Sequence, residues 1–459
     1  MRLPVGLRIR TAAGDLRDGA QLESTGSETA VARTSGVDQR WLRIIPIALL
    51  MYIIAFVDRT NISLALPSMS RELHMDAAQA GSAAGIFFWG YLLLQIPGGY
   101  LAQRWSAKRF VAILLVLWAV CAMACGLVGT ASQFWWMRLL LGVAEGGVWP
   151  AVLVLLANWF RRGERARANA FWMVCLPLAV VISAPISGWI LDHWNWRVLL
   201  LAEGVLPLLW LGPWLALMDD EPTQARWLPE VERDLLLRDL EREAVHSEHP
   251  ASDNVWRALL RPQAWLMVAV YFSFASGMFG YIFWLPSAVE GAKRLSNTFA
   301  GVLFAIPFLV GALAMVVFSR HSDVKSERRR HVSAALAWAG VLLVTGVLLS
   351  NAVPIVAYVL ICLVGAGIYG MMGPFWAIPT ETLPSRLAGP TMGLVNAFGN
   401  LGGYFGPLAV GYLKQRTGNF HYAFLVLAAV MLAGAGLALL LPRSPASSQP
   451  EIQAMGDAR

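Results

Sequence analysis

Long apolar segments separated by short polar breaks make up most of the chain between Trp41 and Leu441. A helix needs about 20 residues to cross the ~30 Å hydrocarbon core of a bilayer, and about twelve segments have that length. The period-two alternation of half-buried strands is absent, and strands exposed to lipid would leave backbone groups unpaired. The pattern therefore predicts an all-α membrane protein. The predicted spans are residues 42–66, 78–100, 108–130, 132–157, 168–191, 197–218, 263–288, 298–320, 331–350, 353–377, 387–413 and 420–441.

The longest polar insert between the apolar segments covers residues 219–262 and separates six predicted helices from six others. Within it, Pro229 suits the first turn of a short helix that we predict over residues 229–242. The chain is therefore predicted to form two six-helix bundles joined by a linker. The predicted parts are a disordered cytoplasmic tail (1–40), an N-terminal bundle (41–218), a cytoplasmic linker (219–262), a C-terminal bundle (263–441) and a cytoplasmic tail (442–459).

Lys and Arg residues concentrate in the loops that follow the second, fourth and eighth predicted helices, and the loops on the other side are poorer in them. Because basic loops stay on the cytoplasmic side, this bias predicts that both termini face the cytoplasm. It also accounts for the net charge of +7 without nucleic acid as a partner. The basic residues of these loops are Arg104, Lys108, Arg109, Arg161, Arg162, Arg165, Arg167, Arg320, Lys325, Arg328, Arg329 and Arg330.

Composition excludes a soluble enzyme, since only 14% of the residues are charged, against about 25% in soluble domains. The four cysteines lie in apolar segments, which excludes a disulfide framework, and neither they nor the seven histidines have the spacing of a metal site. The chain also contains no nucleotide-binding loop, hydrolase elbow or zinc-protease motif. We therefore predict a protein that is not an enzyme, binds no cofactor or metal, and uses an ion gradient or its substrate's own gradient.

Ionisable side chains inside a membrane span are costly and are functional candidates by default. The first half contains Asp58 and Arg59 in its first predicted helix, and Arg138 and Glu145 in its fourth. Seven residues are about two helical turns, so Arg138 and Glu145 share one face roughly 10 Å apart. The second half instead offers aromatic and amide groups, which we expect to contact the substrate and orient the part of it that the charged residues do not bind: Tyr281, Trp284, Trp376, Asn396 and Asn400.

This asymmetry suggests a division of labour between the two halves. Burial disfavours the charged form of a carboxyl group, so Asp58 and Glu145 are candidate proton carriers. An Arg fork binds a carboxylate through two hydrogen bonds, so Arg59 or Arg138 is the candidate site for an anionic substrate. The alternative is that Asp58 with Arg138 and Arg59 with Glu145 form fixed ion pairs. We interpret Glu203, near the outer end of the sixth helix, as structural.

Several short segments carry motifs: Gly99–Arg109, Asp58–Asn61, Tyr91–Gly99, Arg138–Glu145, Pro374–Pro379 and Asn396–Gly403. The first is similar to G-x-L-A-D-R-x-G-x-[RK]-R, the signature of the major facilitator superfamily, and residues 319–329 form a looser second copy. The others resemble patterns of the anion:cation symporter family within that superfamily. The resemblance extends over residues 41–441.

The resemblance implies proton-coupled uptake of organic anions, as by bacterial transporters of tartrate, sugar acids or aromatic acids. It implies proton coupling at Asp58 and Glu145, with Arg138 in the same network. Substrate contacts are implied at Arg59, Tyr91, Trp376 and Asn396. The two basic turns imply residues of conformational gating, which are Gly99, Arg104, Lys108, Arg109, Asp323, Arg328 and Arg329.

The chain departs from the family pattern at two places. Gln103 replaces the Asp of the signature and Ser106 its second Gly, whereas the second copy keeps Asp323. That Asp helps to lock the cytoplasmic side, so we expect a less stable outward-open state. Leu176 and Pro177 occupy the place of a glutamine expected in carriers of sugar acids. This second departure weakens the case for a polyhydroxy acid as substrate.

The sequence thus predicts a proton-coupled symporter for a small organic anion, working by alternating access as a monomer in the bacterial inner membrane. A second hypothesis is a proton-coupled efflux antiporter, since Ser183–Gly188 faintly resembles a Pro/Gly element of antiporters. The third hypothesis is a ligand sensor that transports nothing. It ranks last because the tails and linker contain no evident signalling segment.

Overall fold

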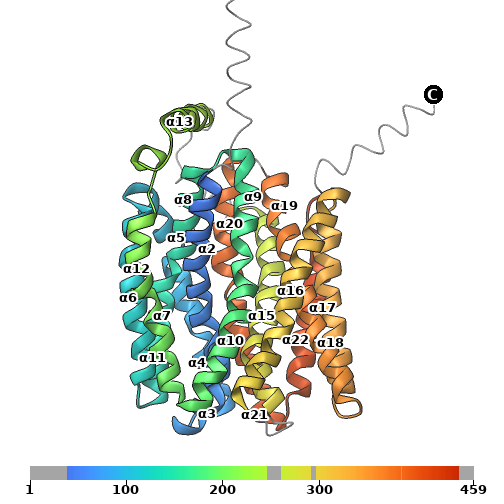
Figure 1. Ribbon diagram of the computed structural model, residues 1–459. Coiled ribbons are helices and arrows are strands. Elements are labelled where there is room, and N and C mark those ends of the chain that lie inside the picture. Colours follow the sequence, from blue (N-terminus) through green and yellow to red (C-terminus); the bar gives the residue numbers. More distant parts are fainter. Residues whose placement is uncertain (1–38, 246–259, 291–295, 384, 444–459) are drawn as a thin grey trace, which may run out of the picture.

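The computed structural model describes residues 39–245, 260–290, 296–383 and 385–443, and the described part contains helices and no strand. The chain therefore has the predicted all-α fold (Figure 1). The predicted tails fall almost wholly outside the described residues. Within the predicted linker, helix α13 covers Glu230–Val245, and a short 3₁₀ turn, η1, precedes it at Pro222–Gln224.

The first bundle consists of six crossings, of which five contain two helices each. In chain order the helices are α2 (Gln39–Thr60) and α3 (Ile62–Glu72), α4 (Ala77–Gly85) and α5 (Phe87–Arg104), α6 (Ala107–Leu127), α7 (Ala131–Gly146) and α8 (Val148–Trp159), α9 (Arg162–Met173) and α10 (Cys175–His193), and α11 (Trp196–Gly204) and α12 (Leu206–Leu217). Such breaks in a membrane helix are tolerated where they are buried in protein or line a cavity.

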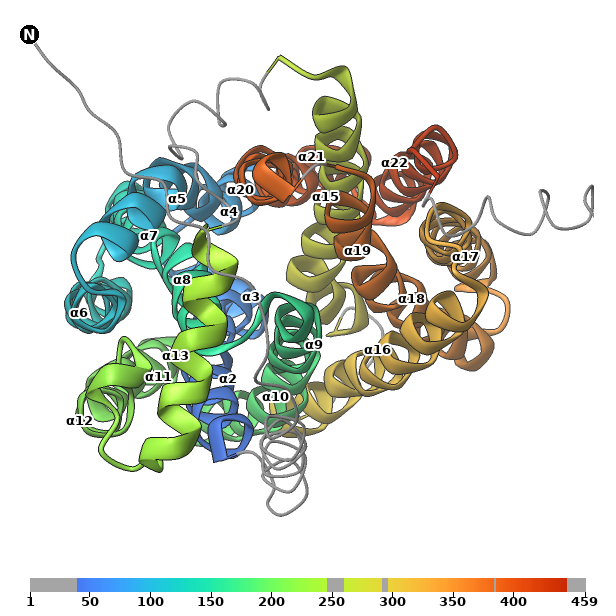
Figure 2. The same ribbon diagram turned by 90° about the horizontal axis from the view of Figure 1, so that it is seen from above.

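The second bundle has fewer broken helices. Its helices are α15 (Pro262–Glu290), α16 (Asn297–Lys325), α17 (Arg329–Leu349), α18 (Pro354–Gly370) and α19 (Met372–Thr382), α20 (Ser385–Gly399) and α21 (Gly402–Thr417), and α22 (His421–Ala438). Seen from above, α2–α12 and α15–α22 form two groups side by side (Figure 2).

Among the described residues, eleven helical segments are long and apolar enough to cross a membrane. The predicted span 387–413 is instead two shorter helices, α20 and α21, which are interrupted at Asn400 and Leu401. The amide of Asn400 donates to the backbone carbonyl of Asn396, and several glycines flank the break. Both features weaken a continuous helix, since glycine and hydrogen-bonding amides disfavour helix interiors.

The two bundles are joined most extensively by α10 packing on α16 and by α4 packing on α21. Glycines allow this approach, because a Cβ at Gly188 would clash with the backbone of Asn297, and a Cβ at Gly301 with that of Ala184. These contacts lie at the end of the molecule opposite α13, which we name the closed end (Figure 1).

A carboxylate also links the bundles at the closed end. Asp192, near the end of α10, accepts hydrogen bonds from the backbone N–H groups of Asn297 (2.7 Å) and Thr298 (2.8 Å), at the first turn of α16. The hydroxyl of Thr298 donates to the same carboxylate. The first N–H groups of a helix lack partners within it, and a carboxylate both satisfies them and complements the helix dipole. Asp192 therefore caps a helix of the other bundle.

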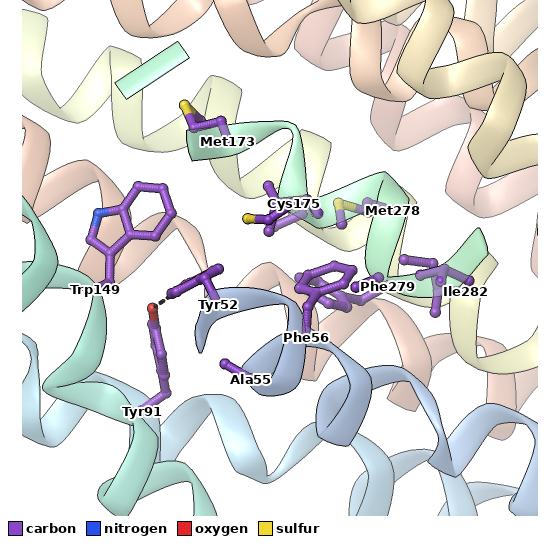
Figure 3. Packing of buried hydrophobic residues seen from close by; sticks show 14 of the residues in the cluster. Tyr52, Ala55, Phe56, Tyr91, Trp149, Met173, Cys175, Met278, Phe279 and Ile282 are labelled. Atoms are coloured by element: carbon purple, nitrogen blue, oxygen red, sulfur yellow. Dashed lines mark hydrogen bonds between the residues drawn. The ribbon is translucent and has the colours of Figure 1, made fainter. Parts of the chain in front are cut away.

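Apolar side chains from both bundles fill the space between them. Figure 3 shows Phe56 of α2 in one buried cluster with Met278, Phe279 and Ile282 of α15. The ring of Phe88 on α5 lies 4.3 Å from that of Phe279, measured between centroids. The polar groups described next are thus enclosed by packed apolar surface, which keeps the local dielectric low.

Candidate functional site

Arg59, in the last turn of α2, lies at the centre of the first bundle. Its Nε donates to Oε2 of Glu145 on α7 at 2.9 Å, and its Nη1 donates to the hydroxyl of Tyr52 at 3.3 Å. The guanidinium also lies over the rings of Tyr91 and Phe87, at 4.6 and 5.3 Å from their centroids. Its Nη2 and the Oε1 of Glu145 are buried without a hydrogen-bond partner among the residues that the structure describes. The pair therefore keeps one free donor and one free acceptor.

Asp58 precedes Arg59 and faces a different set of partners. Its Oδ2 accepts from the indole N–H of Trp118 on α6, and its Oδ1 accepts from Asn61 at 3.4 Å. Arg138 on α7 reaches the backbone carbonyls of Asp58 (3.2 Å) and Ala84 (3.3 Å). In the described part of the chain Arg138 forms no ion pair with the Asp58 carboxylate. Of the two fixed ion pairs in the alternative, the described residues thus form the pair of Arg59 with Glu145 and not that of Asp58 with Arg138.

Two amides connect the bundles close to this pair. Gln95 of α5 donates to the backbone carbonyl of Gly146, the neighbour of Glu145, at 2.8 Å. Its own oxygen accepts from the amide of Asn396 on α20 at 2.9 Å. Asn400 donates to the side chain of Asn396 at 2.8 Å. A chain of hydrogen bonds therefore runs from the helix break of the second bundle to the backbone beside Glu145.

Aromatic side chains of both bundles lie beside these polar groups. Trp376 of α19 contacts Tyr271 of α15, with 5.2 Å between ring centroids, and faces Trp149 of α8 at 6.5 Å. Trp149 in turn packs on Trp172 and on Tyr52, the partner of Arg59. The indole N–H of Trp376 is buried and has no hydrogen-bond partner in the described part of the chain. These rings offer apolar faces and a free donor for a ligand held by Arg59.

The structure does not bring Tyr281 and Trp284 to this group. The hydroxyl of Tyr281 donates to the carbonyl of Ile361 at 3.0 Å, and the indole of Trp284 donates to the carbonyl of Pro407 at 3.0 Å. Both bonds join helices within the second bundle. The other predicted substrate contacts, Arg59, Tyr91, Trp376, Asn396 and Asn400, belong to the connected set described above.

The turn after α5 is bound to the end of the first bundle. Lys108 pairs with Asp219 at 3.7 Å, and the hydroxyl of Ser106 and the N–H of Lys108 donate to Asp220. Arg104 lies over the ring of Tyr100, and the N–H of Arg109 donates to Ser106 at 3.0 Å. Gly99 faces the side chain of Pro150.

The second copy of the turn forms an ion-pair network of its own. Arg328 binds Asp323 and, at 2.7 Å, Glu381 at the end of α19. Burial lowers the pKa of Arg328, but the bonds to Glu381 and Asp323 outweigh it, and the pKa lies above its usual value. Arg329 donates to the carbonyl of Leu439 at 3.0 Å. The turn thereby holds α16, α19 and the end of α22 together.

Close by, the rings of His321 and His331 meet, with 2.8 Å between Nδ1 and Nε2, although sequence spacing did not indicate a pair. His321 lies on α16 and His331 on α17, and the turn between these two helices brings the rings together. In the part of the chain that the structure describes, no group of three metal-ligating side chains occurs.

Several residues of the site were not predicted from the sequence. Tyr52 lies two turns before Arg59 on one helix, a spacing that could have revealed it. Gln95 lies inside the quoted motif Tyr91–Gly99. Trp118 gave no signal, because one aromatic residue in an apolar span is usually packing. Glu203, which we interpreted as structural, is buried, and its Oε2 has no hydrogen-bond partner among the described residues; its role stays a prediction.

Comparison with known proteins identifies the family. Residues 48–407 match the model of the Major Facilitator Superfamily. A "Putative tartrate transporter" of Agrobacterium vitis is 33% identical, over 88% of this chain and 90% of its own length. A "Quinolone resistance transporter" of Acinetobacter baumannii is 27% identical, over 85% of this chain and 91% of its own.

The fold also matches solved structures. The xylose transporter XylE from E. coli, in a partially occluded inward-open conformation, superposes with a TM-score of 0.69 at 16% identity, over 89% of this chain and 99% of that one. At that identity the likeness bears on the fold alone. Together with the family match and the membrane-spanning helices, it agrees with the predicted class of protein. The chain belongs to the major facilitator superfamily and is a multi-pass membrane transporter, not an enzyme.

Proposed function

We propose that the protein is a symporter of the bacterial inner membrane that takes up a small organic anion together with protons. The observation that carries the proposal is the buried guanidinium of Arg59, which binds Glu145 and Tyr52 and keeps Nη2 unpaired. A fork with a free donor, enclosed by aromatic rings, suits a carboxylate that binds through two hydrogen bonds. Relatives that carry the name of tartrate transporter agree with this substrate class.

Glu145 couples this site to protons in the proposal. As a carboxylate it neutralises Arg59 and competes with an anionic substrate for the same guanidinium. Once it is protonated it releases Arg59, which then binds the substrate. Uptake of the proton and of the anion therefore favour each other, as linkage requires.

Asp58 is the second proton carrier in the proposal. It lies within electrostatic range of Glu145, and its carboxyl group is buried without an ionic partner among the described side chains. An ionised carboxylate there is costly. A cavity lined by residues that include Asp58, Asn61, Cys125 and Arg138 has room for about one water molecule beside this carboxyl group.

The second bundle orients the rest of the substrate. Trp376 and Asn396 place an indole N–H and an amide beside the aromatic rings near Arg59. Asn396 also contacts the first bundle through Gln95. A substrate with a hydroxyl or aromatic group beside its carboxylate would use both. This division matches the sequence, which puts charge in the first half and amides and aromatic rings in the second.

We further propose that the closed end faces the outside and that the turns after α5 and α16, with both chain termini, face the cytoplasm. The basic residues of those turns support this orientation. The conformation is then inward-facing, with Asp192 and the glycine contacts of α10 and α16 closing the outer side. No cofactor is required, since the proton gradient supplies the energy, and a monomer contains the whole site.

Purified protein tests the substrate class directly. We expect at least one acid from a panel of L-tartrate, galactarate, glycolate and benzoate to raise the apparent melting temperature, because a ligand of the folded state stabilises it. The same acid is expected to exchange in counterflow across proteoliposomes, and Arg59→Lys is expected to need a higher concentration of it for both effects. If no acid stabilises the protein or exchanges, the proposed substrate class is wrong.

A proton-coupled efflux antiporter is the second candidate, which the quinolone-resistance relative favours. The direction of the gradient separates the two. A proton gradient directed into the vesicles accelerates accumulation by a symporter and opposes it for an antiporter. A sensor that binds without transporting would show the thermal shift and no counterflow.

A further inference from the structure

Glu203 is a buried carboxyl group that the proposed cycle does not use. It lies on α11, one turn and a half after Arg197, and the structure leaves it almost no exposed surface. Its Oε1 accepts a hydrogen bond from Ser187 on α10 at 2.6 Å. Its Oε2 is buried without a partner. No cation lies within ion-pair distance of Glu203 among the side chains that the structure describes.

A second buried polar atom that lacks a partner among the described residues belongs to Asn61. The side chain of Asn61, between α2 and α3, is close enough to the Glu203 carboxyl for a hydrogen bond. The Nδ2 of Asn61 donates to Asp58, whereas its Oδ1, an acceptor, is buried without a donor. An ionised Glu203 would repel that oxygen as long as the amide keeps this orientation. A proton on Oε2 of Glu203 would instead donate to it and satisfy both atoms at once.

We propose that Glu203 is a third proton-binding site of the transporter, protonated in this conformation and linked through Asn61 to Asp58. In the bound form the proton is on Oε2 and donates to Oδ1 of Asn61, whose Nδ2 donates to Asp58. When the proton leaves, Glu203 becomes a carboxylate and the amide of Asn61 must turn its N–H toward it, away from Asp58. The inference rests on the proposed proton coupling and adds a site to it.

The other titratable groups around Glu203 agree with this assignment. Asp58 faces it from α2 and lies within electrostatic range, so the two carboxyl groups disfavour each other's ionisation. Cys121 and Cys125 are the titratable groups in the neighbouring part of α6, where Cys125 lines the cavity beside Asp58. At the closed end, the only cation on the adjoining turn of α11 is Arg197, which Glu72 of α3 pairs at 2.8 Å.

Two more acidic or basic groups lie at the end of α10, the other helix beside Glu203. Asp192 caps α16, and the imidazole of His193 binds the carbonyl of Trp189 at 2.9 Å. Both are exposed and lie more than one helical turn beyond Ser187. Among the described residues no cation is thus left to neutralise a buried Glu203, and a proton does so.

Infrared spectroscopy of the protein in lipid tests this without a transport assay. A protonated carboxyl group has a C=O stretch separate from that of a carboxylate. We expect such a band near neutral pH, its loss in Glu203→Gln, and its retention in Glu72→Gln, whose glutamate is ion-paired. Ser187→Ala, which removes the bond to Oε1, is expected to shift the band without removing it. A spectrum in which Glu203→Gln removes no protonated-carboxyl signal overturns the proposal.

Transport then distinguishes a proton site from a structural acid. In Glu203→Gln we expect counterflow within about twofold of the wild type and a changed pH profile of gradient-driven uptake. Glu203→Asp keeps a carboxyl group and serves if the glutamine variant does not fold. Its pH profile of uptake should still titrate, at a shifted pH. An unchanged pH profile in Glu203→Gln also overturns the proposal. If the band is lost as expected and no acid is transported, the proposed function fails and the protonation of Glu203 stands.

Discussion

The guanidinium of Arg59 and the carboxylate of Glu145 form an ion pair, 2.9 Å between Nε and Oε2, that is buried on both sides and joins α2 to α7. Such a pair costs desolvation, and removing one partner leaves the other charge unpaired. In the proposed function, an anionic substrate takes the place of Glu145 at Arg59. The proposal thus makes this pair a site of competition as well as a structural link.

The first prediction concerns the two members of this pair. Glu145→Gln frees Arg59 permanently, so substrate counterflow is expected to persist while proton-driven accumulation is lost. Arg59→Lys loses the fork, so the affinity for substrate should fall roughly 10- to 100-fold, the loss of one charged hydrogen bond. Binding and counterflow assays measure both effects. Arg197→Lys, in an Arg–Glu pair at the edge of the bundle, is the matched control and should leave both unchanged.

The second prediction concerns the amides that join the bundles. Gln95→Ala and Asn396→Ala each remove the same hydrogen bond, so the double variant should lose less substrate affinity than the sum of the single losses. A coupling of about 1 kcal/mol is expected in a double-mutant cycle. Gln133→Ala provides the control, because the amide oxygen of Gln133 accepts from a loop N–H within the first bundle. Its effect on substrate affinity should be additive with that of Asn396→Ala. Additivity between Gln95 and Asn396 would contradict the connection.

The third prediction concerns the cap of α16. Asp192→Ala removes the acceptor that joins the bundles at the closed end but leaves Ser296, the N-cap residue of α16, in place. We expect a change of about 1 kcal/mol, as for the loss of a capping side chain. The conformational equilibrium should shift toward opening of that end. Spin labels at Arg71 and Gln415, on a background without reactive cysteines, report the distance between the bundles there. The distance distribution should lengthen relative to the wild type.

A matched variant separates this effect from general destabilisation. Asp76 also caps a helix with its carboxylate, but it accepts from Gln79 within the first bundle. Asp76→Ala should cost stability and leave the distance distribution unchanged. If both variants lengthen the distance equally, Asp192 is not a specific link between the bundles.

The fourth prediction concerns close packing at the same end. A Cβ at Gly301 would clash with the backbone carbonyl of Ala184 across the bundles, so Gly301→Ala should lower the population of the closed conformation and the apparent melting temperature. Gly436 of α22 has no atom nearby, so Gly436→Ala should be neutral or stabilising through helix propensity. If Gly301→Ala and Gly436→Ala behave alike, close packing at Gly301 does not stabilise the closed conformation.

The helices and the charged residues of the candidate site could be predicted from the sequence, because charge in an apolar segment is conspicuous. Asp58, Arg59, Arg138 and Glu145 stand out for that reason, and the helices follow from the length of the apolar segments. What could not be predicted depends on distance in space. Gln95 and Asn396 are 301 residues apart and meet only because the bundles face each other.

Glu203 illustrates a different limit. From the sequence it lies near the end of a span beside Trp196 and Arg197, where an exposed glutamate would pair with the arginine. The structure pairs Arg197 with Glu72 instead and turns Glu203 inward to Ser187. Likewise, the predicted eleventh span is broken at Asn400, since its glycines and amides outweigh its apolar residues. Competition between partners decides the first case, and local residue composition decides the second.

The central claim is that Asp58 and Glu145 carry the protons that drive uptake of an organic anion. The direct measurement is proton entry into proteoliposomes containing a pH-sensitive dye, on addition of the panel acid that stabilises the purified protein. Wild type should show anion-dependent acidification, and Asp58→Asn and Glu145→Gln should show none while both still exchange substrate. Full anion-driven proton entry in both variants would contradict the account.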